Sequence, residues 1–277
     1  MVINMNLRTD FADELNIKNN KEYKKSSKTY KNIKLSTIEI LKQKNQFNKD
    51  KGKYISIDFN DLYDNKEREN ISKLLIDALN SLYVLKDNSK ILIVGLGNEK
   101  IIADSLGPNV ADKVIVTNHL FKVMPEQIES NINKVCVLTP KVMGQTGLES
   151  SDIVKAVSEL FKPNLVIIID ALASLSISRV NRVIQLSDTG IAPGSGVGNY
   201  RKEITEKTLN CKVIAIGVAT VVHANNIIED IENKQQIKTD LYNLILTPKD
   251  IDEDIEHLST IIATSINKYV HKDYQKL

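Results

Sequence analysis

The chain has 277 residues, of which 42% are hydrophobic and 26% are charged, and its formal net charge is +2. This length and composition are typical of a globular protein with one large domain or two small ones. No apolar run approaches the roughly 18–20 residues that span a bilayer, and the first residues lack the apolar core of a signal peptide. We therefore expect no membrane span and no secretory leader. Two cysteines are too few for a disulfide scaffold and suit a reducing cytoplasm.

The N-terminal part is polar and basic. Residues 1–32 are rich in Lys and Asn, and we expect them to be mobile. Residues 18–53 contain twelve lysines against three acidic residues. With few aromatic residues and no arginine, we interpret this stretch as a solvated surface and expect no direct nucleic-acid contact. Within and beside it, Ile33–Ile40 and Tyr54–Phe59 alternate apolar and polar residues, which predicts the two strands of a β-hairpin.

Helices and short apolar runs alternate through the rest of the chain. Helical spacing predicts a first helix over Lys66–Lys86. Strand-length apolar runs occur at 91–97, 134–138, 164–170, 182–188 and 212–218, and further helices are predicted over Leu106–Phe121, Ser151–Phe161, Asn225–Ile237 and Asp250–Val270. Fully apolar strands are typical of sheets covered on both faces. The sequence therefore predicts an α/β fold with a mostly parallel central sheet flanked by helices.

Small, polar and acidic residues follow each apolar run. In a parallel sheet, ligands and chemistry gather at the carboxyl ends of the strands. Asp104 and Asp170 lie at or soon after strand ends, and Asp188, Glu149 and His223 occupy similar positions. Carboxylates with one histidine could hold a divalent ion, although no pair has close ligand spacing. A metal site therefore stays open at this point.

Two familiar kinds of site fit the motifs poorly. GLGNEK has Lys100 where a dinucleotide-binding fingerprint needs its third glycine, and the loop SDTGIAPGSGVGN does not open an apolar helix. Ser195 is flanked by adjacent glycines, unlike the serine of a nucleophile elbow. The four histidines, His119, His223, His257 and His271, are widely spaced. A nucleotide site and a histidine-based triad are both disfavoured.

A pair of carboxylates remains. Asp170 ends the most apolar run and precedes Ala-Leu-Ala, so its low-dielectric surroundings should raise its pKa unless hydrogen bonds oppose this. Asp104 follows the first strand by way of the GLGN turn. Two such groups converging on one water could divide the roles of base and acid. The alternative for each is a helix N-cap, which aspartate forms well.

Five strings in order resemble one family. GLGN…DSLGP, VMGQTGLESSD, KPNLVIIIDALAS, RVNRVIQLSDTGIAPGSGVGNYRKEI and KVIAIGVATVV are similar to segments of the spore germination endopeptidases, which degrade small acid-soluble spore proteins in germinating endospores. The resemblance implies an α/β fold like that of hydrogenase maturation proteases, an atypical aspartic endopeptidase without a cofactor or metal, a homotetramer, and a location in the cytoplasm of the forespore or spore core. It places the two catalytic aspartates at Asp104 and Asp170.

The resemblance also implies that the N-terminus is a pro-segment. Family members are zymogens that remove a short pro-segment themselves. Residues 9–14, TDFADE, resemble both the processing site of the family and the sites cut in its substrates. We therefore expect cleavage between Asp10 and Phe11, which makes residues 1–10 a pro-segment and residues 11–277 a single peptidase domain.

The loops 139–149 and 187–199 are expected to line the cleft, where backbone N–H groups could steady an oxyanion. The substrate-binding residues expected there are Gly144, Gln145, Thr146, Asp188, Gly194, Ser195 and Gly196. The chain departs from the family pattern with Ala219 in place of Pro, with His223 in place of Asp, and with only a short stretch around Glu232–Asp240 where an insertion is usual. The alternatives are a metal-dependent peptidase like the hydrogenase maturation enzymes and a non-catalytic sporulation protein on the same scaffold.

Overall fold

The structure is a computed structural model, and it describes residues 9–15, 21–43, 45, 49–128, 132–193, 202–224 and 244–271. Its elements in chain order are η1 (Ala12–Glu14), β1 (Tyr23–Tyr30), β2 (Ile33–Ile40), β3 (Gly52–Asp58), α1 (Asn65–Leu82), β4 (Lys90–Gly95), η2 (Ile102–Asp104), α2 (Leu106–Asp112), α3 (Leu120–Val123), η3 (Pro125–Gln127), β5 (Lys134–Leu138), α4 (Met143–Thr146), α5 (Ser150–Phe161), β6 (Leu165–Ser174), η4 (Ile177–Arg179), β7 (Val183–Ser187), α6 (Glu206–Leu209), β8 (Lys212–His223), β9 (Ile245–Leu246) and α8 (Ile251–Val270).

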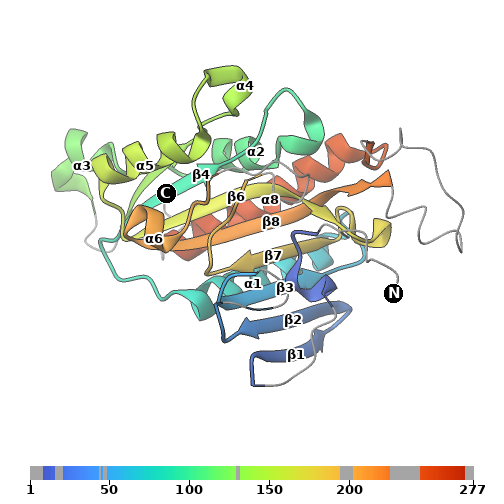
Figure 1. Cartoon of the computed structure of the whole chain (residues 1–277). Coiled ribbons are helices and arrows are strands. Elements are labelled where there is room, and N and C mark those ends of the chain that lie inside the picture. Colours follow the sequence, from blue (N-terminus) through green and yellow to red (C-terminus); the bar gives the residue numbers. More distant parts are fainter. Residues whose placement is uncertain are drawn as a thin grey trace, which may run out of the picture.

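One sheet contains all of these strands (Figure 1). Its order is β1-β2-β3-β7-β8-β6-β4-β5, with β9 paired to β8. Strands β5, β4, β6 and β8 are mutually parallel, which confirms the predicted α/β fold with a mostly parallel sheet. The predicted hairpin is also confirmed, because β2 and β3 pair antiparallel with Ile38 opposite Tyr54.

The first strand differs from the expectation. Residues 23–30 form β1, an edge strand that pairs antiparallel with β2 along its whole length, whereas the sequence was interpreted as mobile there. Within this strand only Tyr23 is buried. Because the rest of β1 is accessible to solvent, its residues are mostly Lys, Ser and Thr. Lysines on an edge strand also hinder pairing with further strands.

Strand β7 runs against the central strands. It pairs antiparallel with both β3 and β8, with Gln185 opposite Gly217. Its residues are all buried, so its sequence has the same apolar character as the parallel strands. Because β7 is antiparallel to β8, its carboxyl end lies beside the amino ends of β4, β6 and β8. Asp188 therefore lies away from the carboxyl ends of those three strands.

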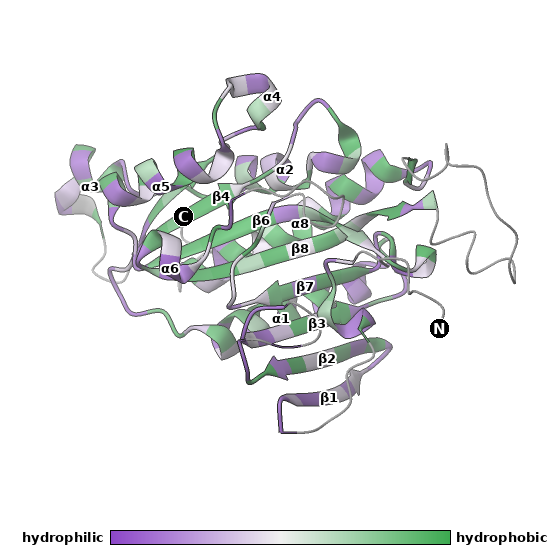
Figure 2. Ribbon diagram, viewed as in Figure 1, coloured by the Kyte–Doolittle hydropathy of each residue, from purple (hydrophilic) through white to green (hydrophobic). Residues whose placement is uncertain are grey.

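Helices cover both faces of the sheet. On one face, α1, α2 and α8 pack on the larger apolar cluster, which includes Ile93, Ile167 and Ile216. On the other face, α5 and α6 cover a smaller cluster around Val94 and Ile168. Figure 2 shows the apolar central strands inside these layers and the more polar β1 at the edge. The alternation of side chains along each strand thus places consecutive residues in two different cores.

The helices agree with their predictions at most positions. Helix α1 begins after Asp64, whose carboxylate accepts a hydrogen bond from the Lys66 amide. Helix α2 ends at Asp112 rather than at Phe121, and the predicted helix over Asn225–Ile237 lies outside the described residues. Among the described helices, none is long and apolar enough to cross a membrane.

Candidate active site

A cavity of about 390 Å³ opens at the carboxyl ends of β4, β6 and β8. It is lined by both predicted catalytic aspartates, Asp104 and Asp170, and by Asp10 from the N-terminus. The other lining residues are Leu96, Gly97, Ile101, Ala103, Val142, Ser150, Ala171, Leu172, Ala173, Pro193, Thr220, Val221, Ile245 and Thr247. Residues from seven separate parts of the chain therefore meet at the carboxyl ends of these strands, where the sequence predicted the site.

Asp104 is held by the turn that follows β4. Its carboxylate accepts a hydrogen bond from the Asn98 amide at 2.9 Å, and its backbone carbonyl accepts from the same amide at 3.0 Å. Gly97 has φ +114°, and a Cβ there would lie 2.0 Å from the Asp104 carbonyl oxygen. Only glycine permits both this backbone conformation and this close approach. The GLGN turn thus fixes where Asp104 stands.

Two further glycines bring α2 against the sheet. A Cβ on Gly107 would lie 2.2 Å from the Leu96 carbonyl oxygen and 2.7 Å from the Ile169 carbonyl oxygen. A Cβ on Gly95 would lie 2.3 Å from the Gly107 carbonyl oxygen. The backbone of α2 therefore rests almost directly on the ends of β4 and β6, immediately after Asp104. This close contact explains why a glycine occupies position 107 of the DSLGP segment.

Asp170 projects from β6 at the level where that strand meets β8. It lies opposite Gly217 in the register, its residue is only 6% exposed, and its carboxylate accepts from the Ala171 amide at 3.0 Å. Since β4 is the neighbour of β6, with Gly95 opposite Ile169, Asp170 and the turn that holds Asp104 adjoin. The two carboxyl groups face one cavity.

A hydroxyl group adds to this cavity. Thr220 is fully buried on β8, and its Oγ1 has no hydrogen-bond partner among the residues that the structure describes. Its carbonyl oxygen accepts from the Thr247 hydroxyl at 2.8 Å, which ties the segment before α8 to the cavity wall. Buried hydroxyl groups usually find a partner, so the Thr220 hydroxyl is an exception among the described residues.

The residues Thr9–Leu15, which we call the N-terminal segment, are docked beside this cavity. The Asp10 amide donates to the Ala173 carbonyl at 3.2 Å, and the Asp10 carboxylate accepts from the Ala173 amide at 3.0 Å. One backbone and one side-chain hydrogen bond thus attach Asp10 to the end of β6. In Figure 1, the blue η1 lies in front of β3 and β7.

Gln185 forms hydrogen bonds with the backbone of the segment on both sides of Phe11. Its side-chain carbonyl accepts from the Ala12 amide at 2.8 Å, and its side-chain amide donates to the Asp10 carbonyl at 3.2 Å. Lys49 Nζ donates to the same carbonyl at 3.0 Å and to the Thr9 carbonyl at 3.2 Å. Burial lowers the pKa of Lys49, whereas the carboxylates of Asp10, Glu14 and Asp50 act in the opposite sense.

The Phe11 ring fills an apolar pocket. Phe11 is fully buried against Leu172, Val183 and Ala219, and the Arg179 guanidinium lies 5.1 Å from its ring centroid. The resemblance marks Ala219 as a departure from the family pattern, and Ala219 lies in the wall of the pocket that holds Phe11, the residue after the predicted processing bond.

Arg179 binds three carboxylates around the segment. It forms a bidentate pair with Asp13 at 3.1 and 2.8 Å, a second pair with Glu14 at 3.2 Å and a third with Asp58 at 2.9 Å. Its side chain is 15% exposed. Burial is the largest influence on the pKa of Asp58 and raises it, although the neighbouring Arg179 acts in the opposite sense. Glu14 also accepts from the Leu175 amide at 2.9 Å. The acidic residues of the segment are therefore fully engaged.

The expected substrate-binding residues lie in three different settings. Gly144, Gln145 and Thr146 are exposed on α4, which projects from the body in Figure 1, while the neighbouring Val142 and Ser150 line the cavity. Asp188 does not line this cavity, and it accepts from the Lys53 amide at 2.7 Å. Gly194, Ser195 and Gly196 lie outside the described residues, although Pro193 from the same loop reaches the cavity.

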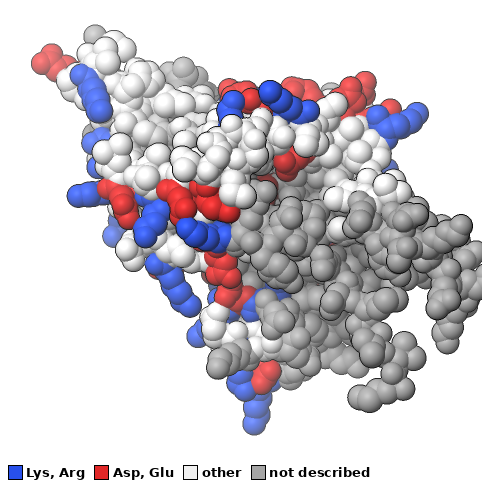
Figure 3. Space-filling model, turned by 45° about the horizontal axis from the view of Figure 1, so that its top comes forward, with Lys and Arg blue, Asp and Glu red and all other residues white. Residues whose placement is uncertain are grey.

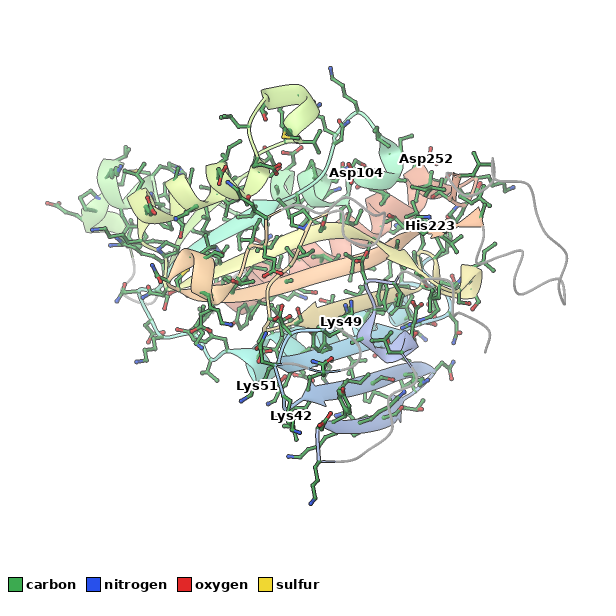
Figure 4. All side chains as sticks on the ribbon, viewed as in Figure 1. Lys42, Lys49, Lys51, Asp104, His223 and Asp252 are labelled. Carbon is green, nitrogen blue, oxygen red and sulfur yellow. The ribbon has the colours of Figure 1, made fainter. Side chains whose placement is uncertain are left out.

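His223 is the histidine that lies at the carboxyl end of a sheet strand. Figure 4 labels His223 at the end of β8 and Asp104 nearby. Across the residues described by the structure, no group of three or more His, Cys, Asp or Glu side chains is arranged to hold a metal ion. Figure 3 shows acidic and basic side chains interspersed over the described part of the face that is turned toward the viewer.

Sequence reasoning missed Lys49, Gln185 and Arg179. Lys49 is one of twelve lysines in the basic stretch and carries no distinguishing pattern. Gln185 offered a signal, because it is a polar residue in the middle of the apolar run RVIQLSD, and a buried amide needs partners. Arg179 is one of few arginines in the chain, but only the fold brings it to residues 13 and 14.

Comparisons with known proteins identify the family of this chain. The model of the family described as germination protease (Peptidase_A25) matches residues 2–234. The germination protease of Clostridium tetani is 39% identical over 271 residues, which cover 85% of this chain and 84% of that protein. That of Oceanobacillus iheyensis is 45% identical over 226 residues, which cover 79% and 61%.

One solved structure is also similar. It is the crystal structure of the [NiFe] hydrogenase maturation protease HycI from Thermococcus kodakarensis KOD1, with a TM-score of 0.37 and 18% identity, covering 68% of this chain and 98% of that one. The family match spans most of the chain, and the relatives are similar along most of its length. The chain therefore belongs to the germination protease family.

Proposed function

We propose that this protease initiates the degradation of small acid-soluble spore proteins during germination. In this proposal it is made as a zymogen, it hydrolyses its own Asp10–Phe11 bond, and Asp104 and Asp170 are the reacting carboxyl groups. The observation that carries the proposal is that one cavity is lined by both aspartates and by Asp10. The resemblance also supports a homo-oligomer that acts in the spore core.

The chemistry needs one ionised and one protonated carboxyl group. One aspartate takes a proton from a water molecule whose oxygen adds to the carbonyl carbon of the scissile bond. The other donates a proton to the departing nitrogen. In either assignment of Asp104 and Asp170, each carboxylate also accepts a backbone N–H group, which fixes its orientation.

The cavity wall supports such a reaction. Much of it is apolar, including Leu96, Ile101 and Leu172. Closing a peptide into an apolar cavity removes water and strengthens the interactions of charge with charge and with dipoles.

The docked segment supports the choice of substrate. Its sequence has an acidic residue before the bond, an aromatic residue and alanine after it, and two further acidic residues. Phe11 fills an apolar pocket, and Arg179 pairs with Asp13 and Glu14. A protein substrate with the same pattern would find the same pocket and the same guanidinium.

The test uses Asp104→Asn and Asp170→Asn. We expect both variants to leave the Asp10–Phe11 bond intact and to fail to cut a synthetic TDFADEL peptide, while their melting temperatures stay near that of the unsubstituted protein. Asp112→Asn is the matched control, because Asp112 is an exposed residue at the end of α2. Unchanged cleavage by either active-site variant would refute the pair.

Two further readouts separate the alternatives. Loss of peptide cleavage after exhaustive chelation, with recovery on adding back a divalent metal, would favour a metal-dependent peptidase. Failure of the unsubstituted protein to cut its own segment, the peptide or a small acid-soluble spore protein would favour a non-catalytic role. Full activity after chelation is the result that the aspartate pair predicts.

A further inference from the structure

The carbonyl group of Asp10 is held in an unusual way. Lys49 Nζ lies 3.0 Å from its oxygen, and the Gln185 side-chain amide lies 3.2 Å from it. One of these donors is a cation from the loop between β2 and β3, and the other is a buried amide on β7. This oxygen belongs to the peptide bond at which we propose self-cleavage, so the inference below rests on the proposed function.

Asp10 also forms the boundary between two cavities. On one side lies the cavity that contains Asp104 and Asp170, and on the other lies a cavity of about 290 Å³ lined by Lys49 and Gln185. Both cavities include Asp10 and Leu172 in their walls. A peptide group at this boundary has Asp104 and Asp170 toward one side and the donors Lys49 and Gln185 toward the other, where Asp50 and Glu203 also line the cavity.

We propose that Lys49 and Gln185 are catalytic residues that stabilise the oxyanion formed when water attacks the Asp10 carbonyl carbon. Donors that stabilise an oxyanion lie about 2.7–3.1 Å from the position of that oxygen, and they are most effective where water is excluded. The present distances are those of the uncleaved amide. The Lys49 donor at 3.0 Å already lies within this range, and a small contraction as negative charge develops would bring the Gln185 donor, now at 3.2 Å, into it as well.

Hydrolysis of the Asp10–Phe11 bond would take place in two stages. The water oxygen forms a bond to the Asp10 carbonyl carbon while one aspartate accepts a water proton, and the π electron pair moves onto the carbonyl oxygen. Lys49 and Gln185 donate hydrogen bonds to this oxyanion. When the intermediate collapses, the carbon–nitrogen bond breaks, its electron pair goes to the Phe11 nitrogen, and that nitrogen takes a proton from the other aspartic acid. The products are a carboxyl group on residue 10 and an amino group on residue 11.

A purely anchoring role for Lys49 predicts different behaviour. The segment has other attachments, including the Ala173 pairing, the Gln185 contact with the Ala12 amide and the Arg179 ion pairs. These attachments do not involve Lys49. Removing the Lys49 ammonium should therefore leave the segment docked and affect mainly the reaction rate.

The experiment compares Lys49→Met with Lys51→Met, and both lysines are labelled in Figure 4. Lys51 is exposed and two residues away, so its variant controls for the loss of one charge in this loop. We expect Lys49→Met to slow self-cleavage, followed by intact mass, by about 100-fold or more. Lys51→Met should cleave at the rate of the unsubstituted protein.

Gln185→Glu gives an independent second variant. It keeps an oxygen that can accept from the Ala12 amide but loses the donor to the Asp10 carbonyl, and it adds a negative charge where the oxyanion would form. We expect a comparable loss of rate. Amide hydrogen exchange at Ala12 should stay as slow in Lys49→Met as in Asp170→Asn, which also remains uncleaved and serves as the reference for a docked segment.

The outcomes are distinct. Self-cleavage of Lys49→Met at the rate of Lys51→Met would overturn the proposal, and so would fast exchange at Ala12 in Lys49→Met, because the lysine would then be an anchor. If Lys49→Met is slow while both aspartate variants cleave normally, the aspartate pair fails and the oxyanion site stands. A protein that leaves both its own bond and the TDFADEL peptide intact contradicts the proposed function and this proposal together.

Discussion

Arg179→Met is predicted to release the N-terminal segment from the body of the protein. The guanidinium pairs with Asp13, Glu14 and Asp58, whose side chains are 9%, 6% and 25% exposed. Methionine can replace much of the apolar stem and can still pack on Phe11, but it leaves three carboxylates close together without their shared cation. Their mutual repulsion then opposes docking.

The magnitude follows from the burial of these groups. Removing one partner from a buried ion pair costs about 3–5 kcal/mol. Because Arg179 is 15% exposed and Asp58 is 25% exposed, the lower end applies, about 3 kcal/mol. If the segment unfolds together with the body, this loss lowers the melting temperature by about 6–12 °C, at roughly 2–4 °C per kcal/mol. If the segment undocks separately, the loss appears as faster exchange at Ala12.

The assay combines thermal unfolding with amide hydrogen exchange in an Asp170→Asn background that keeps the segment uncleaved. Arg182→Met is the matched control, because Arg182 is exposed and donates to the Asn60 carbonyl at 2.9 Å. We expect little change in that control. If Arg179→Met matches Arg182→Met in both melting temperature and exchange at Ala12, the account of how the segment is held is wrong.

Two further predictions concern the body of the protein. His271 is buried and its pKa is lowered by burial, although its hydrogen bond to the Ile115 carbonyl opposes the shift. The unfolded chain therefore binds a proton below about pH 6.5 that the folded chain disfavours, so the free energy of unfolding should fall as the pH drops below that value. Urea unfolding at about pH 7.5 and about pH 5.5 should show a smaller difference for His271→Gln; an equal difference would contradict the assignment. Gly107→Ala should cost about 1–3 kcal/mol by pushing α2 from the sheet, and it should slow self-cleavage by moving Asp104; cleavage at the normal rate would show that this contact does not set the site.

The two aspartates of the site could be predicted because the signals that identify them lie in short stretches of sequence. Apolar runs followed by acidic residues identify strand ends, and parallel strands bring their ends to one edge. Asp104 and Asp170 could be selected in this way, and both line the same cavity. The glycines of GLGN and DSLGP also act locally, by allowing the backbone to approach closely where a Cβ would collide.

The direction of β7 could not be predicted in the same way. Its apolar run has the character of a buried parallel strand, but its direction depends on pairing with β3 and β8, which are distant in sequence. The prediction for Asp188 depended on that direction. The loop after β7 nevertheless reaches the cavity of the two aspartates at Pro193, and its residues 189–192 line the second cavity.

The contacts of the N-terminal segment also could not be predicted from the sequence. Polar composition predicted mobility for residues 1–32, and polar residues do not form a core of their own. Phe11 and Ala12 are nevertheless fully buried because β2, β3, β6 and β7 supply surfaces made elsewhere in the chain. A short apolar stretch in a polar terminus can thus signal docking onto a preformed surface rather than disorder.

The most direct test of the account is the intact mass of the purified protein after incubation under maturing, mildly acidic conditions. The account predicts that the unsubstituted protein and Asp112→Asn lose residues 1–10, whereas Asp104→Asn and Asp170→Asn keep them. N-terminal sequencing should then begin at Phe11. Loss of the same residues from either active-site variant, at the rate of the unsubstituted protein, would contradict the assignment of Asp104 and Asp170 as the reacting pair.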